Sequence, residues 1–195
     1  MGKEVLSEER IILNSLTQTQ IIKAIPLDDE VEVYGKSVLV TEMSVEGIIT
    51  YVNRRFISLT GFSKEELLGS SCNIVKHPDM PEGLFVALWK VIAQKKIWRG
   101  YVKNLRKDGK YFWTLMYVQA KLDDNQNIVG YTTSQKVAYK STIEALEEEY
   151  KALKISGDSS YFMRAESYNV DSLIYHEQQL AKKNGLTYAI KKEKI

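Results

Sequence analysis

The chain has 195 residues, of which 44% are hydrophobic and 27% charged, and its formal net charge is +2. A net charge this small gives no reason to expect nucleic-acid binding. The chain holds one cysteine, Cys72, which excludes an internal disulfide and favours a reducing compartment. No apolar run approaches the roughly 18 residues of a membrane span, and no signal peptide is apparent, so we expect a cytoplasmic protein without a membrane span.

Residues 1–35 combine a helical pattern with a polar connector. Ser7 can cap a helix, and the apolar side chains that follow it, including Ile11 and Ile12, recur at helical spacing. We therefore expect a helix over Ser7–Thr19, whose apolar stripe packs on the domain or on a second copy of the chain. Pro26 ends regular structure and is followed by the connector.

Residues 36–138 alternate between strand and helix patterns and form the expected central domain. Short helical patterns lie between the second and third strands, at Asn53–Thr60, after Ser63 and at Glu82–Ala93. Hairpin turns join the strands at both ends, which predicts one five-stranded antiparallel sheet with the short helices on one face, an α+β fold. The expected strands are Ser37–Met43, Ile48–Val52, Trp98–Leu105, Tyr111–Lys121 and Ile128–Val137.

Residues 139–195 are expected to hold flanking helices and a basic tail. The first of these helices, Ser141–Lys154, places its apolar residues at heptad spacing. A second helix is expected near residues 166–183. Because apolar stripes beyond the needs of one core usually mark contacts, we expect the helices Ser7–Thr19 and Ser141–Lys154 to form a dimer or partner surface.

A nonapeptide at the centre of the chain, Asn73-Ile74-Val75-Lys76-His77-Pro78-Asp79-Met80-Pro81, concentrates charged and rigid residues. Proline fixes its own φ and disfavours helical geometry in the residue before it, so we expect a shaped loop here. Pro81 followed by Glu82 favours the start of a helix. A lone histidine beside proline is more often a turn residue than a ligand, so the loop alone does not decide between a structural and a binding role.

Residues 36–138 resemble a PAS domain. The series Gly47–Asn53 and the pair Thr60-Gly61 match the first half of the family pattern, and Arg106–Trp113 matches its hairpin. The nonapeptide, together with Trp89, Trp98, Gly100 and Lys103-Asn104, closely resembles the FAD-binding PAS domain of bacterial aerotaxis receptors.

This resemblance implies a flavoprotein with FAD as its cofactor. Lys76 stands where arginine is common, which keeps the positive charge but loses bidentate geometry. The resemblance implies a non-catalytic redox or oxygen sensor in energy taxis. Because the chain shows neither the membrane anchor nor the signalling hairpin that aerotaxis receptors carry, we expect either a homodimer that works through a separate membrane-bound chemotaxis-type transducer and is held at the inner membrane by that partner, or an excised fragment of such a receptor. The cofactor-binding residues it implies are Lys76, His77, Asp79, Trp98 and Asn104, with weaker matches at Asn53 and Trp89.

Light-sensing LOV domains, which are also PAS domains, are similar to the chain in other places. Cys72 follows Gly69 by three residues, as in those domains, and Gln135 matches their last-strand glutamine near the flavin. However, Asn73-Ile74-Val75 follows the cysteine where those domains have Arg-Phe-Leu-Gln, and Thr114 replaces a second flavin-contacting asparagine. We therefore expect no light-driven adduct, although both resemblances imply a flavin.

The residue types suit such a ligand. An isoalloxazine needs an apolar slot closed by a few amides, and Asn104 and Gln135 each offer a donor and an acceptor. Lys76 and His77 can meet a diphosphate, and Asp79 can bind a hydroxyl or orient His77.

Four alternatives stay open at this point. They are a haem sensor using His77 or His176, a LOV-like photoreceptor using Cys72, a flavin enzyme, and a ligand-free PAS dimerisation module. No catalytic triad, metal cluster or phosphate-binding loop is visible in the sequence, so we expect no enzymatic activity and no bound metal.

Overall fold

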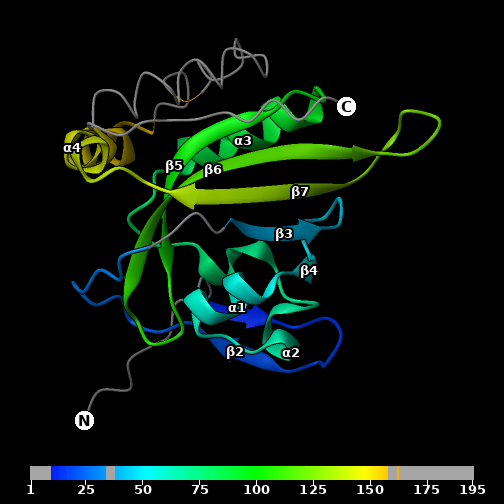
Figure 1. The fold of residues 1–195 in the computed structure, drawn as a ribbon, viewed down its shortest axis with the longest axis horizontal. Helices are drawn as coiled ribbons and strands as arrows, with labels where there is room; N and C mark the ends of the chain where they lie inside the picture. Colours follow the sequence, from blue (N-terminus) through cyan, green and yellow to red (C-terminus); the bar gives the residue numbers. More distant parts are fainter. Residues whose placement is uncertain (1–9, 34–37, 158–161, 163–195) are drawn as a thin grey trace.

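The computed structural model describes residues 10–33, 38–157 and 162. Its centre is a five-stranded antiparallel sheet with the strand order β4-β3-β7-β6-β5 (Figure 1). All five expected strands are present, which confirms the α+β prediction. Their bounds are β3 Leu39–Met43, β4 Ile49–Val52, β5 Trp98–Leu105, β6 Tyr111–Leu122 and β7 Ile128–Val137.

Short helices connect β4 to β5, as predicted. Their bounds are α1 Arg54–Thr60, α2 Lys64–Leu67, the 3₁₀ helix η2 Cys72–Val75, and α3 Glu82–Ala93. Three of these helices begin at a residue whose side chain accepts from a free backbone N–H: Asn53 accepts from Phe56 N at 2.9 Å, Ser63 forms a capping box with Glu66, and Ser71 accepts from Asn73 N. Gly61 ends α1 in the left-handed conformation.

The two faces of the sheet pack against different elements, because successive side chains in a strand point to opposite sides. On β6, Met116 faces a cavity on the side of α1 and α3, whereas the Trp113 ring lies 6.0 Å from the Tyr150 ring of α4 (Lys140–Ser156). Figure 1 shows α1 and α2 on one side of the sheet and α4 at the far end, beyond the end of β7. None of the described helices has the length and apolar character that crossing a bilayer requires.

The apolar stripe of α4 packs within the chain itself. Ile143 and Tyr150 are buried, Leu146 and Leu153 pack against the same core, and the Tyr150 hydroxyl donates to the carbonyl of Tyr101 at 3.1 Å. Much of the stripe that predicted a contact surface is therefore covered by the sheet. The expected helix near 166–183, His176 and the basic tail lie outside the described residues.

The expected N-terminal helix is wrong over residues 11–19, where the chain forms a hairpin. Strands β1 (Ile11–Leu13) and β2 (Gln20–Ile22) pair in antiparallel register. The turn closes because Asn14 N donates to the Thr19 carbonyl at 2.9 Å, while the Asn14 side chain accepts from two turn amides and donates to carbonyls of α2. The prediction counted apolar spacing and missed this local side-chain competition with helical hydrogen bonds.

Candidate functional site

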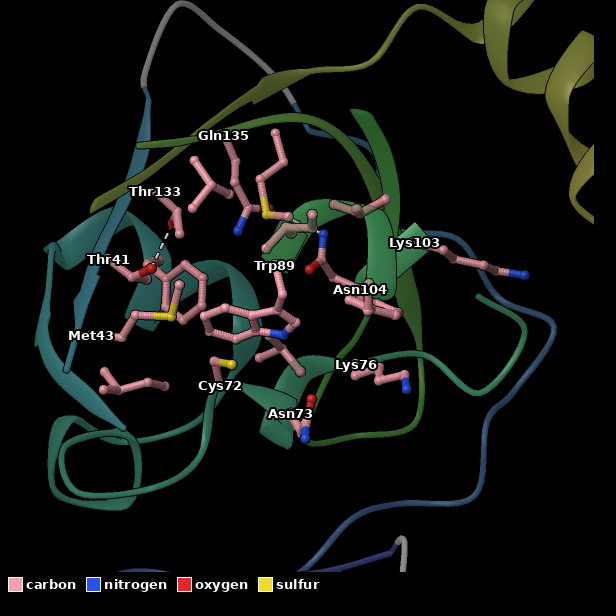
Figure 2. A pocket seen from close by; sticks show the side chains of 18 of the residues that line it. Thr41, Met43, Cys72, Asn73, Lys76, Trp89, Lys103, Asn104, Thr133 and Gln135 are labelled. Atoms are coloured by element: carbon pink, nitrogen blue, oxygen red, sulfur yellow. Dashed lines mark hydrogen bonds between the residues drawn. The ribbon is translucent and has the colours of Figure 1, made fainter. Parts of the chain in front are cut away.

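A cavity of about 280 Å³ lies between the sheet and α3, close to the lower end of ordinary small-molecule pockets (Figure 2). Its walls are mainly apolar, with a few polar groups converging on it. The lining residues are Thr41, Met43, Ile49, Phe56, Cys72, Asn73, Val75, Lys76, Glu82, Phe85, Val86, Leu88, Trp89, Val102, Lys103, Asn104, Met116, Val118, Thr133 and Gln135.

Two buried amides and one hydroxyl form a network on the sheet side of the cavity. Asn104 Nδ2 donates to Thr114 Oγ1 at 3.0 Å and to Gln135 Oε1 at 3.2 Å, and Thr114 Oγ1 donates to Gln135 Oε1 at 2.7 Å. Gln135 Oε1 accepts the bonds from Asn104 and Thr114, so Gln135 Nε2 faces the cavity. Asn104 Oδ1 also faces the cavity (Figure 2). The wall thus presents one donor and one acceptor side by side.

Strand register brings this network together. Asn104 is on β5, Thr114 on β6 and Gln135 on β7, three neighbouring strands, and all three side chains are buried. Sequence reasoning selected Asn104 and Gln135 but gave Thr114 no part in the site. It also missed the hydroxyl pair of Thr41 and Thr133, whose Oγ1 atoms lie 2.6 Å apart; alternation along paired strands is the signal that could have found it.

Trp89 projects from α3 across the cavity. Its ring packs edge-on against Tyr131, with ring centroids 5.4 Å apart. Figure 2 shows the indole between the amide network and Cys72. A Cβ atom at Gly47 would lie 3.5 Å from both the Cys72 sulfur and the Trp89 ring, so the sulfur and the indole share one corner of the cavity. Burial raises the pKa of the Cys72 thiol, which keeps it protonated.

Lys76 lies where the central loop meets the edge strand β5. Its backbone forms an antiparallel bridge with Asn104, so the loop and the amide network are held together. The Lys76 ammonium pairs with the exposed carboxylate of Glu82 and lies 4.5 Å from the centre of the Phe85 ring. A cation therefore stands at the mouth of the cavity.

His77 and Asp79 lie along the same loop but do not line the cavity. The His77 ring is 2% exposed; its Nδ1 accepts from Asp79 N at 3.2 Å, and its edge packs 5.7 Å from the Tyr111 ring. The Asp79 carboxylate accepts from Lys103 Nζ at 3.1 Å. Lys154 of α4 donates to the Pro78 carbonyl at 2.7 Å, so this loop touches the last described helix.

The buried His77 predicts an acid-sensitive fold. Burial, reinforced by the charge of Lys103, lowers the pKa of His77 from 6.5 to about 4. Between these pH values His77 is protonated in the unfolded chain but stays neutral in the folded chain. The free energy of unfolding therefore falls as pH drops from about 6.5 toward 4. We expect the free energy of unfolding to fall by about 2 kcal/mol more between pH 7 and 4.5 in wild type than in His77→Gln. Urea titrations at both pH values measure this; equal losses in the two proteins would contradict it.

Trp98 and Asn53, two other predicted cofactor contacts, also lie outside the cavity lining. Trp98 is 1% exposed and folds over Gly100, where a Cβ atom would lie 2.3 Å from the indole. Asn53 caps α1, and its Nδ2 donates to the Val38 carbonyl at 2.8 Å. The structure thus brings Lys76, Trp89, Asn104 and Gln135 together around the cavity, and leaves Asn53, His77, Asp79 and Trp98 outside its lining.

Comparison with known proteins supports the fold. Residues 49–134 match the family model described as the PAS fold. This part of the chain has the PAS fold. The aerotaxis receptor of Escherichia coli (strain K12) is 33% identical over 115 residues, which are 59% of this chain and 22% of the receptor. A blue-light photoreceptor of Listeria monocytogenes serovar 1/2a is 31% identical over 80 residues, which are 41% of this chain and 32% of that protein.

Solved structures show the same PAS architecture. The dark structure of the blue-light photoreceptor Aureochrome1 LOV matches with a TM-score of 0.51 and 26% identity, covering 60% of this chain and 86% of that one. These findings confirm the predicted resemblance to the aerotaxis-receptor type of PAS domain and its LOV-like features. The chain spans about a third or less of the length of the two relatives above, and the boundaries predicted for the domain at 36 and 138 stay predictions.

Proposed function

We propose that the protein is a flavin-binding PAS sensor of redox state or oxygen, with FAD as its cofactor and no catalytic activity of its own. The observation that carries this proposal is the network of Asn104, Thr114 and Gln135, which presents an amide nitrogen and an amide oxygen to an otherwise apolar cavity. The rim of an isoalloxazine alternates donors and acceptors, so this pair is complementary to it.

The other lining residues fit the same ligand. Val102, Met116 and Leu88 supply apolar walls, and Lys76 supplies a cation at the mouth for a phosphate. A bound flavin would supply a redox-active ring whose hydrogen-bonding edge changes when it is reduced. Lys76, Trp89, Asn104 and Gln135 would contact it, while Asn53, His77, Asp79 and Trp98 would keep the surrounding walls in place.

For the output we propose a separate membrane-bound chemotaxis-type transducer. A homodimer of this chain binds this transducer. The homodimer is cytoplasmic and is held at the inner membrane by that partner. The relation to a protein named as an aerotaxis receptor supports energy taxis as the process. Gln135 lies on β7, which leads directly into α4, and Lys154 of α4 binds the loop at Pro78. Both β7 and the loop at Pro78 are thus joined to α4, so a movement of either can be passed on through this helix.

The absorption spectrum of the purified protein, followed by identification of the released cofactor, tests the proposal. We expect flavin bands and released FAD. A protein that stays colourless after incubation with FAD, FMN and riboflavin would rule the proposal out, and a Soret band would indicate haem instead. The structure gives haem little support at His77, because the ring is buried away from the cavity and its Nδ1 already accepts a hydrogen bond.

A LOV-like photoreceptor is the second candidate, because the sulfur of Cys72 does line the cavity. The Trp89 indole lies between that sulfur and the amide network (Figure 2), so a ring held by the amides would be screened from the thiol. We therefore expect no reversible bleaching under blue light, in wild type or in Cys72→Ala. Bleaching in wild type that disappears in Cys72→Ala would favour the photoreceptor.

A further inference from the structure

A second hollow, of about 630 Å³, lies between the N-terminal hairpin and the central loop. From here on it is called the hairpin groove. Ile12, Ala24 and Pro26 line it on the hairpin side, and Pro78 lines it on the loop side. The family model begins only at residue 49, so the hairpin side of this groove lies outside the matched PAS region.

The hairpin groove and the central cavity meet at three residues. Asn73, Lys76 and Glu82 line both of them. The two hollows therefore adjoin at these residues, and a ligand that extended out of the cavity past Lys76 would reach the hairpin groove. Because the side chain of Glu82 is 74% exposed, it is free to turn toward water and leave the Lys76 ammonium to an anionic ligand.

The junction carries a second cation that is fixed in place. Lys23 is 7% exposed, and its Nζ donates to the carbonyls of Asn73 at 2.9 Å and Lys76 at 2.7 Å. These bonds attach the hairpin to the loop directly behind the junction. Arg10 adds its positive charge to the same wall, where its guanidinium donates to the Lys23 carbonyl at 3.0 Å. The positive charges favour phosphate at the junction.

We propose that the hairpin groove binds the adenosine-phosphate half of FAD, so that the N-terminal hairpin selects the dinucleotide over FMN. The inference rests on the proposed flavin function and adds to it a second subsite. The diphosphate lies at the junction near Lys76, and the adenine lies against the apolar surface of Ile12, Ala24 and Pro26. FMN ends at its single phosphate, so it reaches the junction and gains nothing from the groove.

The proposal is tested by titrating the flavin-free full chain with FAD and with FMN, with quenching of flavin fluorescence as the signal. In wild type the Kd for FAD should be at most about one tenth of the Kd for FMN. Ala24→Trp fills the groove and should raise the Kd for FAD to that for FMN, leaving FMN binding unchanged. Ile25→Trp, next along the chain but exposed and outside the groove lining, is the matched control and should keep the wild-type preference.

Four outcomes overturn the proposal, and they are distinguishable. Equal Kd values for FAD and FMN in wild type, or equal weakening of both by Ala24→Trp, would overturn the groove assignment and leave the flavin function standing. Failure of wild type to bind any flavin would overturn the function as well. Hydrogen exchange of residues 10–26 in wild type provides a readout free of substitution: FAD should slow it more than FMN does, and equal protection would overturn the assignment.

Discussion

Replacement of Asn104 by leucine is expected to weaken flavin binding about a hundredfold while the domain stays folded. The Asn104 side chain is 5% exposed and donates to Thr114 Oγ1 and Gln135 Oε1. Leucine has a similar volume but no polar atoms, so the ligand loses an acceptor and Gln135 loses one of the two donors that orient it. Each buried polar group left unpaired costs about 1–3 kcal/mol, and two such losses amount to roughly a hundredfold in Kd.

The measurement is a flavin titration of the flavin-free protein, with thermal unfolding to confirm that the variant is folded. Asn125→Leu is the matched control, since Asn125 is exposed in the turn between β6 and β7, and it should bind flavin as wild type does. A folded Asn104→Leu protein with wild-type affinity would show that the amide network is not the flavin contact.

The site could be predicted in part because residue type and strand position survive in the sequence, whereas side-chain direction does not. Asn104 and Gln135 were found from their places in the family pattern, and the strand register brings them to one wall. Trp98 shares the pattern, but Gly100 leaves room for its ring to fold back along β5, so it fills the core. His77 is held outside the cavity by the bond that its Nδ1 accepts from Asp79 N and by its ring contact with Tyr111, which the spacing of residue types does not reveal.

The fold of the sheet was predictable because turn and capping residues are recognisable in the sequence. Asp108-Gly109 is such a turn pair and lies between β5 and β6, and Ser63 is such a capping residue and forms a capping box at the start of α2. The N-terminal hairpin was missed partly because apolar spacing does not report the local turn bonds of Asn14, and partly because its other bonds join residues far apart in the chain. Asn14 is bound to carbonyls of Glu65, Glu66 and Leu68, and no pattern within residues 10–23 reports these partners.

Asn14→Ala is expected to cause the largest loss of stability. Asn14 is fully buried; its Nδ2 donates to the carbonyls of Glu65, Glu66 and Leu68 at 2.8–3.2 Å, and its Oδ1 accepts from Leu16 N and Thr17 N at 3.0 Å. Alanine removes all of these bonds at once and leaves carbonyls near the end of α2 without this donor. We expect the free energy of unfolding to fall by about 3 kcal/mol in urea titrations.

A substitution at the nearby Gly69 tests whether the expected loss of stability comes from the contact between the hairpin and α2. Gly69 has φ +84°, and a Cβ atom there would lie 2.8 Å from Asn14 Oδ1 and 2.6 Å from Leu16 Cγ, so Gly69→Ala should also displace the hairpin. Since both variants break the same junction, the double variant should lose less stability than the sum of the two single losses. Thr17→Ala, which removes an exposed hydroxyl bonded to the Thr19 hydroxyl in the same turn, should change stability by less than about 0.5 kcal/mol. If Asn14→Ala is as stable as Thr17→Ala, the hairpin is held by its apolar contacts and not by this buried amide.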